Sequence, residues 1–204
     1  MGRDSGASGL SAREITVGYG KDAPILEGLS LDVLEGELTV IVGPNACGKS
    51  TLLRCLARVL GARSGVVELD GVELGTMNQK ALARRLGLLA QSSVAPGDML
   101  VEDLVARGHY PHHGLVRQWS AVDDEAVAGA MRDAGVSALA GRRVGELSGG
   151  QRQRVWIAMA LAQSTDILLL DEPTTYLDLN HQLEVLRLAQ RLQRQGRTIV
   201  AVLH

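Results

Sequence analysis

The chain has 204 residues, enough for one domain with a substantial core, and its 21 Lys and Arg against 23 Asp and Glu give a formal net charge of −2. This balance excludes the strongly basic footprint of a nucleic-acid-binding domain, and the 46% hydrophobic content excludes an intrinsically disordered chain. Two cysteines, Cys47 and Cys55, exclude a disulfide scaffold and a four-cysteine zinc site, and no apolar run reaches the roughly 18 residues of a membrane span.

The first half of the chain predicts a tail, several short strands and one helix. Residues 1–9 are polar and rich in Gly and Ser, which favours a flexible tail. A continuous apolar run at Leu38–Val42 predicts a strand buried on both faces, and the helix Lys49–Leu60, ended by Gly61, follows it. In chain order, the strands expected here are Glu14–Tyr19, Leu29–Val33, Leu38–Val42, Val66–Asp70 and Leu86–Ala90.

The second half begins with a helical segment and then returns to strands. Helical patterns at Val101–Arg107 and Ala121–Ala134 stand in a region without a convincing strand pattern. After it, strands and helices alternate, which is typical of a mostly parallel α/β sheet. The elements expected in this last part are Gln151–Gln163, Ile167–Leu170, Leu179–Gln195 and Thr198–Leu203.

This pattern predicts one domain that an insertion interrupts. We expect a single domain over 10–204, with its core formed by 10–91 and 148–204 and a helical subdomain at 92–147.

A phosphate-binding loop follows the strand at Leu38–Val42 and opens a helix. Its residues match the pattern G-x-x-x-x-G-K-[ST] and are Gly43, Pro44, Asn45, Ala46, Cys47, Gly48, Lys49 and Ser50, with Thr51 next. The glycines let successive backbone N–H groups turn toward an anion, and the helix N-terminus adds its positive dipole. We expect Lys49 to reach the β- and γ-phosphates of ATP and Ser50 to bind Mg²⁺, and we interpret Cys47 as a small tolerated residue rather than a redox switch.

Two acids, Asp171 and Glu172, end the apolar strand Ile167–Leu170. A parallel strand brings its C-terminal residues to the sheet edge where the phosphate loop lies. We therefore expect Asp171 to hold Mg²⁺ through water and Glu172 to orient or deprotonate the attacking water.

A second glycine-rich helix start reads Leu147-Ser148-Gly149-Gly150-Gln151. Ser148 is a natural N-cap, and two glycines expose backbone N–H groups, so this start also suits an anion. An ordinary Ser/Gly helix cap would look the same, and one nucleotide per chain does not need a second receptor.

The pentapeptide LSGGQ at 147–151 is the signature of the ATP-binding cassette (ABC) family, and the chain resembles that family from about Glu14 to His204. The order of the motifs also matches: phosphate loop, Gln91 after a strand, signature, Asp171-Glu172 and a terminal histidine. The resemblance implies a P-loop NTPase (RecA-like) α/β core with a mostly parallel sheet, an N-terminal antiparallel β part and an inserted helical subdomain, C-terminally short.

The resemblance also implies roles for single residues, with ATP and Mg²⁺ as cofactors. Tyr19 matches the aromatic residue that stacks on adenine, and His204 matches the histidine that contacts the γ-phosphate. Gln91 matches the glutamine that senses the γ-phosphate and Mg²⁺ and couples to a membrane partner. With Lys49 and Glu172, Gln91 and His204 complete the expected catalytic set, while Ser50, Gln91 and Asp171 form the expected metal set.

In this family two cassettes pair head to tail, and each ATP lies between the phosphate loop of one and the signature of the other. The resemblance therefore implies a homodimer in which Ser148, Gly149, Gly150 and Gln151 meet the nucleotide held by the partner chain. Asp178 matches the loop that crosses the dimer interface.

Three segments resemble the ferric-siderophore and haem importer ATPases. They are 43–51 with Ala46, 102–114, where that subgroup usually has Arg in place of His109, and 172–182. This implies an ATPase subunit at the cytoplasmic face of the membrane, energising uptake of an iron–siderophore complex. Its partners would be a separate permease and, indirectly, a substrate-binding protein, with no nucleic acid.

Two alternative functions stay open at this point. One is a soluble ABC protein, such as a fragment of a ribosome-associated type. The other is a nucleotide-binding module with little turnover, because the family continues for several tens of residues after the position of His204; the strand Thr198–Leu203 would then be less stable than usual.

Three weaker features favour ordinary structure. His109, His112 and His113 have a spacing that could suit a metal, but Pro111 interrupts a helix there. Pairs of arginines are scattered along the chain, which favours solvated faces or dimer contacts. An apolar stripe in the last helix predicts a core face, formed by Leu179, Leu183, Leu186 and Leu192.

Overall fold

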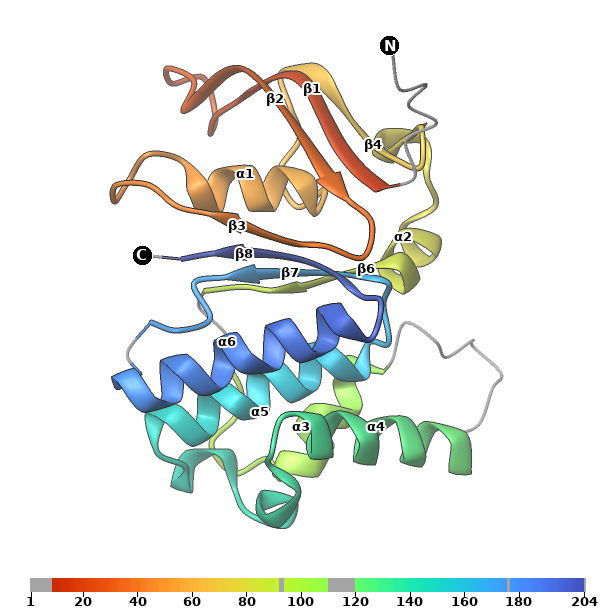
Figure 1. The fold of residues 1–204 in the computed structure, drawn as a ribbon, viewed down its shortest axis with the longest axis vertical. Coiled ribbons are helices and arrows are strands. Elements are labelled where there is room, and N and C mark those ends of the chain that lie inside the picture. Colours follow the sequence, from red (N-terminus) through yellow and green to blue (C-terminus); the bar gives the residue numbers. More distant parts are fainter. Residues whose placement is uncertain (1–8, 92–93, 110–119, 176, 204) are drawn as a thin grey trace.

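The structure, a computed structural model, describes residues 9–91, 94–109, 120–175 and 177–203. Two sheets lie one above the other with helix α1 between them, and the remaining long helices cover the far face of the second sheet (Figure 1). The first sheet is antiparallel in the order β2-β1-β4-β5, and the second is parallel in the order β3-β8-β7-β6. The predicted α/β fold with a parallel sheet and an N-terminal antiparallel part is confirmed.

The strands are short and the helices fall mainly after the phosphate loop. The strands are β1 Gly9–Val17, β2 Leu26–Leu34, β3 Leu38–Ile41, β4 Ser64–Leu69, β5 Val72–Glu73, β6 Leu86–Leu89, β7 Ile167–Asp171 and β8 Thr198–Val202. The α-helices are α1 Lys49–Leu56, α2 Gln79–Arg85, α3 Val101–Gly108, α4 Ala121–Asp133, α5 Gly149–Ala162 and α6 Leu179–Arg194. Short 3-10 turns are Leu74–Thr76, Ser137–Leu139 and Val144–Glu146.

The two central strands of the parallel sheet divide the core into two clusters. Alternate residues of β7 point to opposite faces: Leu168 and Leu170 join α3–α6, while Ile167 and Leu169 join α1 and the antiparallel sheet. Every residue of β7 and β8 is buried. Because both faces of these strands are covered, their carboxyl ends are held rigidly at one edge.

The prediction for the strand at 38–42 is wrong in one respect. It forms β3, but Val40 is 43% exposed, and the strand is not buried on both faces. The physical reason is its place in the sheet: β3 lies at the edge and pairs only with β8. The apolar run alone does not distinguish an edge strand from a central one.

Several element boundaries differ from the expectation, and one helix is additional. Helix α1 ends at Leu56 rather than at residue 60, because Arg58 adopts a left-handed φ of 57°. Strand β1 begins at Gly9, inside the expected tail, whose residues 1–8 lie outside the described part of the chain. Helix α2 was not expected; Asn78 caps it by accepting from the backbone N–H groups of Lys80 and Ala81.

The predicted core face of α6 is only partly right. Leu192 is buried as predicted and Leu186 is half-buried, but Leu179 and Leu183 are exposed. The other buried residues of the helix are Val185, Leu188 and Ala189. The expected stripe follows leucines alone, but Val and Ala at helical spacing fill the space against the sheet. The division into a core and a subdomain at 92–147 stays a prediction, although α3 and α4 do fall within that segment.

Candidate functional site

The phosphate loop connects β3 to α1 and is wound tightly enough to need an unusual backbone. Gly48, the N-cap of α1, has φ 97°, and a side chain there would collide with Ile25 and Leu26. Ala46 also has a left-handed φ of 61°. No side chain caps the helix, so its first N–H groups stay available to a ligand.

Lys49 folds back into its own loop. Its side chain is 7% exposed, and its Nζ donates to the carbonyl oxygens of Gly43 (2.8 Å) and Pro44 (2.7 Å). The ammonium group therefore lies inside the curve of the loop, where phosphate oxygens would compete with the two carbonyls.

Ser50 and Asp171 meet, although 121 positions separate them. The Ser50 hydroxyl donates to Asp171 Oδ1 at 2.7 Å, and Asp171 is 1% exposed at the carboxyl end of β7. Burial raises the pKa of Asp171, and the charge of Glu172 acts in the same direction. The Ser50 hydroxyl and the charge of Arg54 oppose this rise. A buried carboxylate with a raised pKa and a hydroxyl beside it form an oxygen donor set suited to a hard cation.

Glu172 is held by two neighbours. Gln91 Nε2 donates to Glu172 Oε2 at 2.6 Å, and Thr175 Oγ1 donates to the same oxygen at 3.0 Å. Glu172 has a left-handed φ of 51°, which turns the chain sharply after β7. These contacts fix the orientation of the carboxylate.

A cavity of about 730 Å³ joins these groups, a volume within the range of small-molecule sites. Its walls combine the phosphate loop and the start of α1 with the segments around Gln91 and Glu172. Two further wall residues, Ile25 and Thr175, are not among the site residues that the sequence motifs predict. Thr175 was detectable in principle, since it lies at turn spacing from Glu172; Ile25 carries no such signal.

Tyr19 lies just after β1 and is 42% exposed. Its hydroxyl accepts a hydrogen bond from Arg54 Nη1 at 3.0 Å. Because Arg54 belongs to α1, this contact ties the aromatic ring to the helix that begins at the phosphate loop.

The signature residues form the first turn of α5, away from this cavity. Ser148 and Gln151 form a capping box, with Gln151 N to Ser148 Oγ at 3.3 Å and Ser148 N to Gln151 Oε1 at 3.1 Å. A side chain at Gly149 would meet nothing within 4 Å. None of 148–151 lines the cavity among the described residues.

Asp178 is the N-cap of α6 and accepts from both the backbone and the ring of His181, at 2.9 Å and 2.8 Å. The backbone N–H of His181, followed by its side chain, lowers the pKa of Asp178. The His181 ring lies about 3.5 Å from the position of a Cβ at Gly150, so this loop borders the signature.

Some expected residues receive no structural account. His204, His112 and His113 lie outside the described residues. His109 is buried, and its ring nitrogens contact Ala162 O (2.8 Å) and Asp123 Oδ1 (3.0 Å), a packing role between helices. Within the described ranges no group of three or more His, Cys, Asp or Glu side chains could hold a metal.

Comparison with known proteins decides the family. The ABC transporter family model matches residues 26–175. The chain belongs to the ABC transporter family. It is an ATP-binding domain of the transporter ATPases, as the signature and the phosphate loop predict.

The relatives of this ABC protein include importer subunits. The ferric enterobactin transport ATP-binding protein FepC of Escherichia coli (strain K12) is 51% identical over 96% of this chain and 72% of its own length. The probable siderophore transport system ATP-binding protein YusV of Bacillus subtilis (strain 168) is 49% identical over 98% and 72%. The hemin import ATP-binding protein HmuV of Rhodococcus jostii (strain RHA1) is 42% identical over 99% and 68%.

Solved structures agree with the fold. A dimeric ATP-binding cassette in a post-hydrolysis state, bound to ADP and Pi, matches with a TM-score of 0.82 at 26% identity, over 96% of this chain and 88% of that one. A nucleotide-free cassette from an ABC transporter matches with a TM-score of 0.83 at 25% identity, over 96% and 81%.

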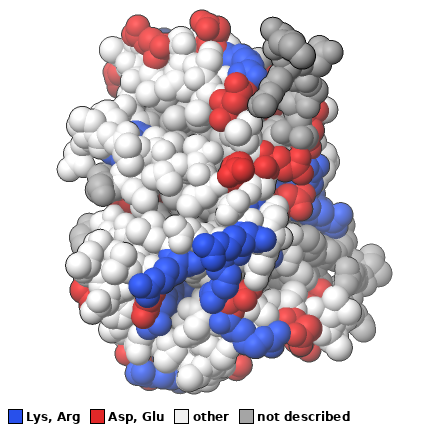
Figure 2. Space-filling model, in the orientation of Figure 1, with Lys and Arg blue, Asp and Glu red and all other residues white. Residues whose placement is uncertain are grey.

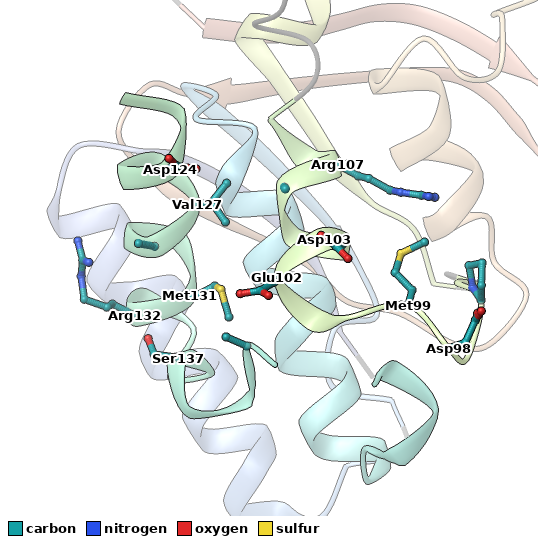
Figure 3. A pocket seen from close by; sticks show the side chains of 14 residues that line it. Asp98, Met99, Glu102, Asp103, Arg107, Asp124, Val127, Met131, Arg132 and Ser137 are labelled. Atoms are coloured by element: carbon teal, nitrogen blue, oxygen red, sulfur yellow. The ribbon is translucent and has the colours of Figure 1, made fainter. Parts of the chain in front are cut away.

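A second, larger hollow of about 1160 Å³ lies between α3 and α4 of the ABC protein. Apolar side chains line it together with carboxylates, and Figure 3 shows Glu102 on α3 and Met131 on α4 pointing toward one another. The carboxylates are those of Asp98, Glu102, Asp103 and Asp124, against the guanidinium groups of Arg107 and Arg132. Arg132 is already paired with Glu125 at 2.6 Å. We refer to this hollow as the α3–α4 groove.

The arginines are less scattered than the sequence suggests. Figure 2 shows Lys and Arg side chains gathered in a band over the lower half of one face. One pocket brings together Arg132, Arg154, Arg187 and Arg191 with Asp133 and Glu184. The absence of a nucleic-acid partner stays a prediction. In the described part of the chain, no helix combines the length and the apolar character that crossing a membrane requires.

Proposed function

We propose that this chain is the ATP-hydrolysing subunit of an importer for iron–siderophore complexes. The single observation that supports it best is one cavity lined by Lys49, Ser50, Gln91 and Glu172. Asp171 lies buried behind its wall, hydrogen-bonded to Ser50. The iron–siderophore assignment is supported by what FepC and YusV are named to transport. The proposed location is the cytoplasmic face of the membrane.

The phosphates would bind along the loop, Gly43 through Thr51. Its backbone N–H groups and the uncapped start of α1 supply donors, and Lys49 would exchange the carbonyls of Gly43 and Pro44 for β- and γ-phosphate oxygens. The ring of Tyr19 would stack on adenine, with 42% of its surface open to do so.

The donor set fits Mg²⁺. Ser50 and Gln91 would bind it directly and Asp171 through water, because Mg²⁺ prefers oxygen ligands and retains several waters. The bound ion would neutralise phosphate charge. The buried Asp171 gains a counter-charge in this arrangement, which opposes the rise in its pKa that burial causes.

Glu172 would act as the general base. Gln91 and Thr175 both donate to one of its oxygens, so the carboxylate is oriented before a water arrives. His204 would contact the γ-phosphate, a role that rests on the family resemblance.

The signature would act on the nucleotide of a second copy. Ser148, Gly149, Gly150 and Gln151 form an exposed helix start away from the chain's own cavity, which supports a head-to-tail dimer with two shared sites. Asp178 would lie in the loop that crosses between the copies, since its partner His181 borders Gly150. A solved dimeric cassette with a matching fold supports this assembly.

The α3–α4 groove would bind the permease. Four carboxylates against two guanidinium groups favour a segment that carries a Lys or Arg, while Met99 and Met131 suit its apolar side chains. Pro96, which lines the groove, lies five positions after Gln91 in the chain, so a partner bound in the groove would sit close in sequence to a residue of the nucleotide cavity. A substrate-binding protein would be an indirect partner.

The variant Glu172→Gln tests the chemistry. We expect it to bind Mg-ATP, lose hydrolysis by about 100-fold or more, and accumulate as a dimer, because it lacks the base but keeps the binding groups. Light scattering with sizing chromatography measures the dimer. Glu125→Gln, which does not line the cavity, is the matched control. A monomer at saturating Mg-ATP contradicts the shared-site arrangement.

Affinity purification from detergent-solubilised native membranes tests the partner. Recovery of a permease with many spans supports the importer, and its loss in Glu102→Lys but not in Glu73→Lys supports the groove. Recovery of ribosomal or other soluble partners instead would favour the alternative function and contradict the importer.

A further inference from the structure

We propose that Arg63 is a positioning residue that holds the loop bearing Tyr19 in place for the nucleotide base, with Arg54 as a second support. This rests on the proposed function, in which Tyr19 meets adenine. Neither arginine lines the nucleotide cavity, so both act through Tyr19 and its loop.

The backbone of Arg63 is anchored beside the loop. Arg63 directly precedes β4, and its backbone N–H donates to Thr16 O at 2.8 Å, where β1 pairs with β4. From this position the guanidinium group reaches across the turn that follows β1.

Three carbonyl oxygens of that turn converge on Arg63. Nη1 donates to Asp22 O at 2.7 Å, and Nη2 donates to Tyr19 O at 3.1 Å and to Gly20 O at 3.3 Å. Within the described ranges its guanidinium makes no ion pair with a carboxylate. A cation that binds only backbone carbonyls of one turn fixes the shape of that turn.

Gly18, which has no side chain, leaves the space that the Arg63 guanidinium group occupies. A Cβ at Gly18 would lie 2.7 Å from Arg63 Nη2, so a side chain before Tyr19 would displace the guanidinium group. The turn also has an internal bond, Asp22 N to Tyr19 O at 3.3 Å, which is long. Arg63 therefore supplies most of the hydrogen bonds that hold the backbone of the loop.

Arg54 contacts Tyr19 at the end of its side chain. Its guanidinium group, on α1, donates to the Tyr19 hydroxyl, while Arg63, just before β4, donates to the backbone carbonyl of Tyr19. The ring is thus fixed relative to the helix that carries Lys49 and Ser50. A preorganised ring loses less conformational entropy when a base stacks on it, so the two arginine contacts should raise the affinity for the nucleotide.

The test compares two probes, ATP and inorganic tripolyphosphate, in the full chain. We expect Arg63→Ala to weaken ATP binding by about fivefold and to leave tripolyphosphate binding unchanged, because only ATP carries the base. Arg58→Ala is the matched control, since Arg58 also donates to a backbone carbonyl, Met77 O at 2.6 Å. Should Arg63→Ala fail to fold, Arg63→Lys replaces it, because Lys keeps the charge but has a compact ammonium group in place of the planar guanidinium fork.

A double-mutant cycle separates positioning from a general structural effect. In a Tyr19→Ala background, Arg63→Ala should cost no further ATP affinity, because the ring that it positions is gone. The proposal would be overturned if the two substitutions weakened ATP binding independently, so that their fold-losses multiplied. It would also be overturned if Arg63→Ala weakened tripolyphosphate binding as much as ATP binding. If the unaltered chain binds tripolyphosphate but gains nothing from the base, the assigned role of Tyr19 fails; if it binds neither probe, the proposed function fails.

The contribution of Arg54 is tested through its partner. Arg54 also acts on the charge of Asp171, so its own removal would change two things at once. Tyr19→Phe removes only the hydroxyl and should weaken ATP binding by about twofold, with tripolyphosphate again unchanged. No difference between Tyr and Phe would remove Arg54 from the proposal and leave Arg63.

Discussion

The two glycine-rich helix starts of this protein, at α1 and α5, are built to different degrees. At α1, Gly48 has no side-chain cap, Lys49 lies buried in the loop, and Ser50, which lines the cavity, is hydrogen-bonded to the buried Asp171. At α5, Ser148 and Gln151 cap each other, and the space beside Gly149 is open. At the first start, the groups that would hold phosphate and a cation all come from one chain, whereas the second start is an exposed surface that, among the described residues, lines no part of the nucleotide cavity.

Removing the ammonium group of Lys49 from the phosphate loop should have the largest effect. Lys49→Met should weaken ATP binding by about 100-fold or more, because a buried charge-assisted contact to phosphate is lost. Isothermal titration measures it. Lys80→Met, on the exposed start of α2, is the control and should bind ATP normally. Retained binding in Lys49→Met would contradict the phosphate site.

Filling the open space beside Gly149, at the start of α5, should lower the rate of ATP hydrolysis without changing the affinity for ATP. Gly149→Ala should lower hydrolysis by about tenfold while the affinity of one chain for ATP stays unchanged, because the added methyl group meets nothing in the monomer. Helix propensity favours Ala, so the variant should fold at least as well. Gly141→Ala, which also meets nothing within 4 Å, should leave both quantities unchanged. A loss of affinity in the monomer would contradict the division between the two starts.

The buried carboxylate of Asp171 should lower the stability of the nucleotide-free protein. Because the folded pKa of Asp171 is raised, the free energy of unfolding falls as pH rises from the unfolded pKa through the folded one. Asp171→Asn removes this fall and should raise Tm near pH 7 by about 2–4 °C, the shift that about 1 kcal/mol produces at this size.

The measurement is urea unfolding of both proteins between pH 4 and pH 7. The advantage of Asp171→Asn should grow with pH, and stabilisation by Mg-ATP should disappear. A constant difference across this range would show that Asp171 titrates normally.

The smallest expected effect concerns the cap of the second start. Ser148→Ala breaks the capping box and should cost about 1 kcal/mol of stability, which urea unfolding detects. Gly48 offers no equivalent cap to lose, so the two helix starts should differ in this respect as well. An unchanged stability would show that the capping box contributes nothing at an exposed helix start.

Much of the nucleotide cavity was predictable because its parts are local in sequence. Lys49 and Ser50 follow a glycine loop at fixed spacing, and Asp171 and Glu172 end an apolar run, so parallel topology alone brings them to one edge. The Ser50–Asp171 contact follows from that topology. The supports of Tyr19 were not predictable, since Arg54 and Arg63 contact it from 35 and 44 positions away without any motif.

The sequence by itself determined the family, the strand–helix order and the residues that carry the chemistry, because backbone propensity and motif spacing act within a few residues. Only the tertiary structure decided that β3 lies at an edge, that α6 buries Val185 and Leu188 rather than Leu183, and that the signature stands apart from the cavity. These outcomes depend on which surfaces meet, and that is set by packing between segments far apart in the chain.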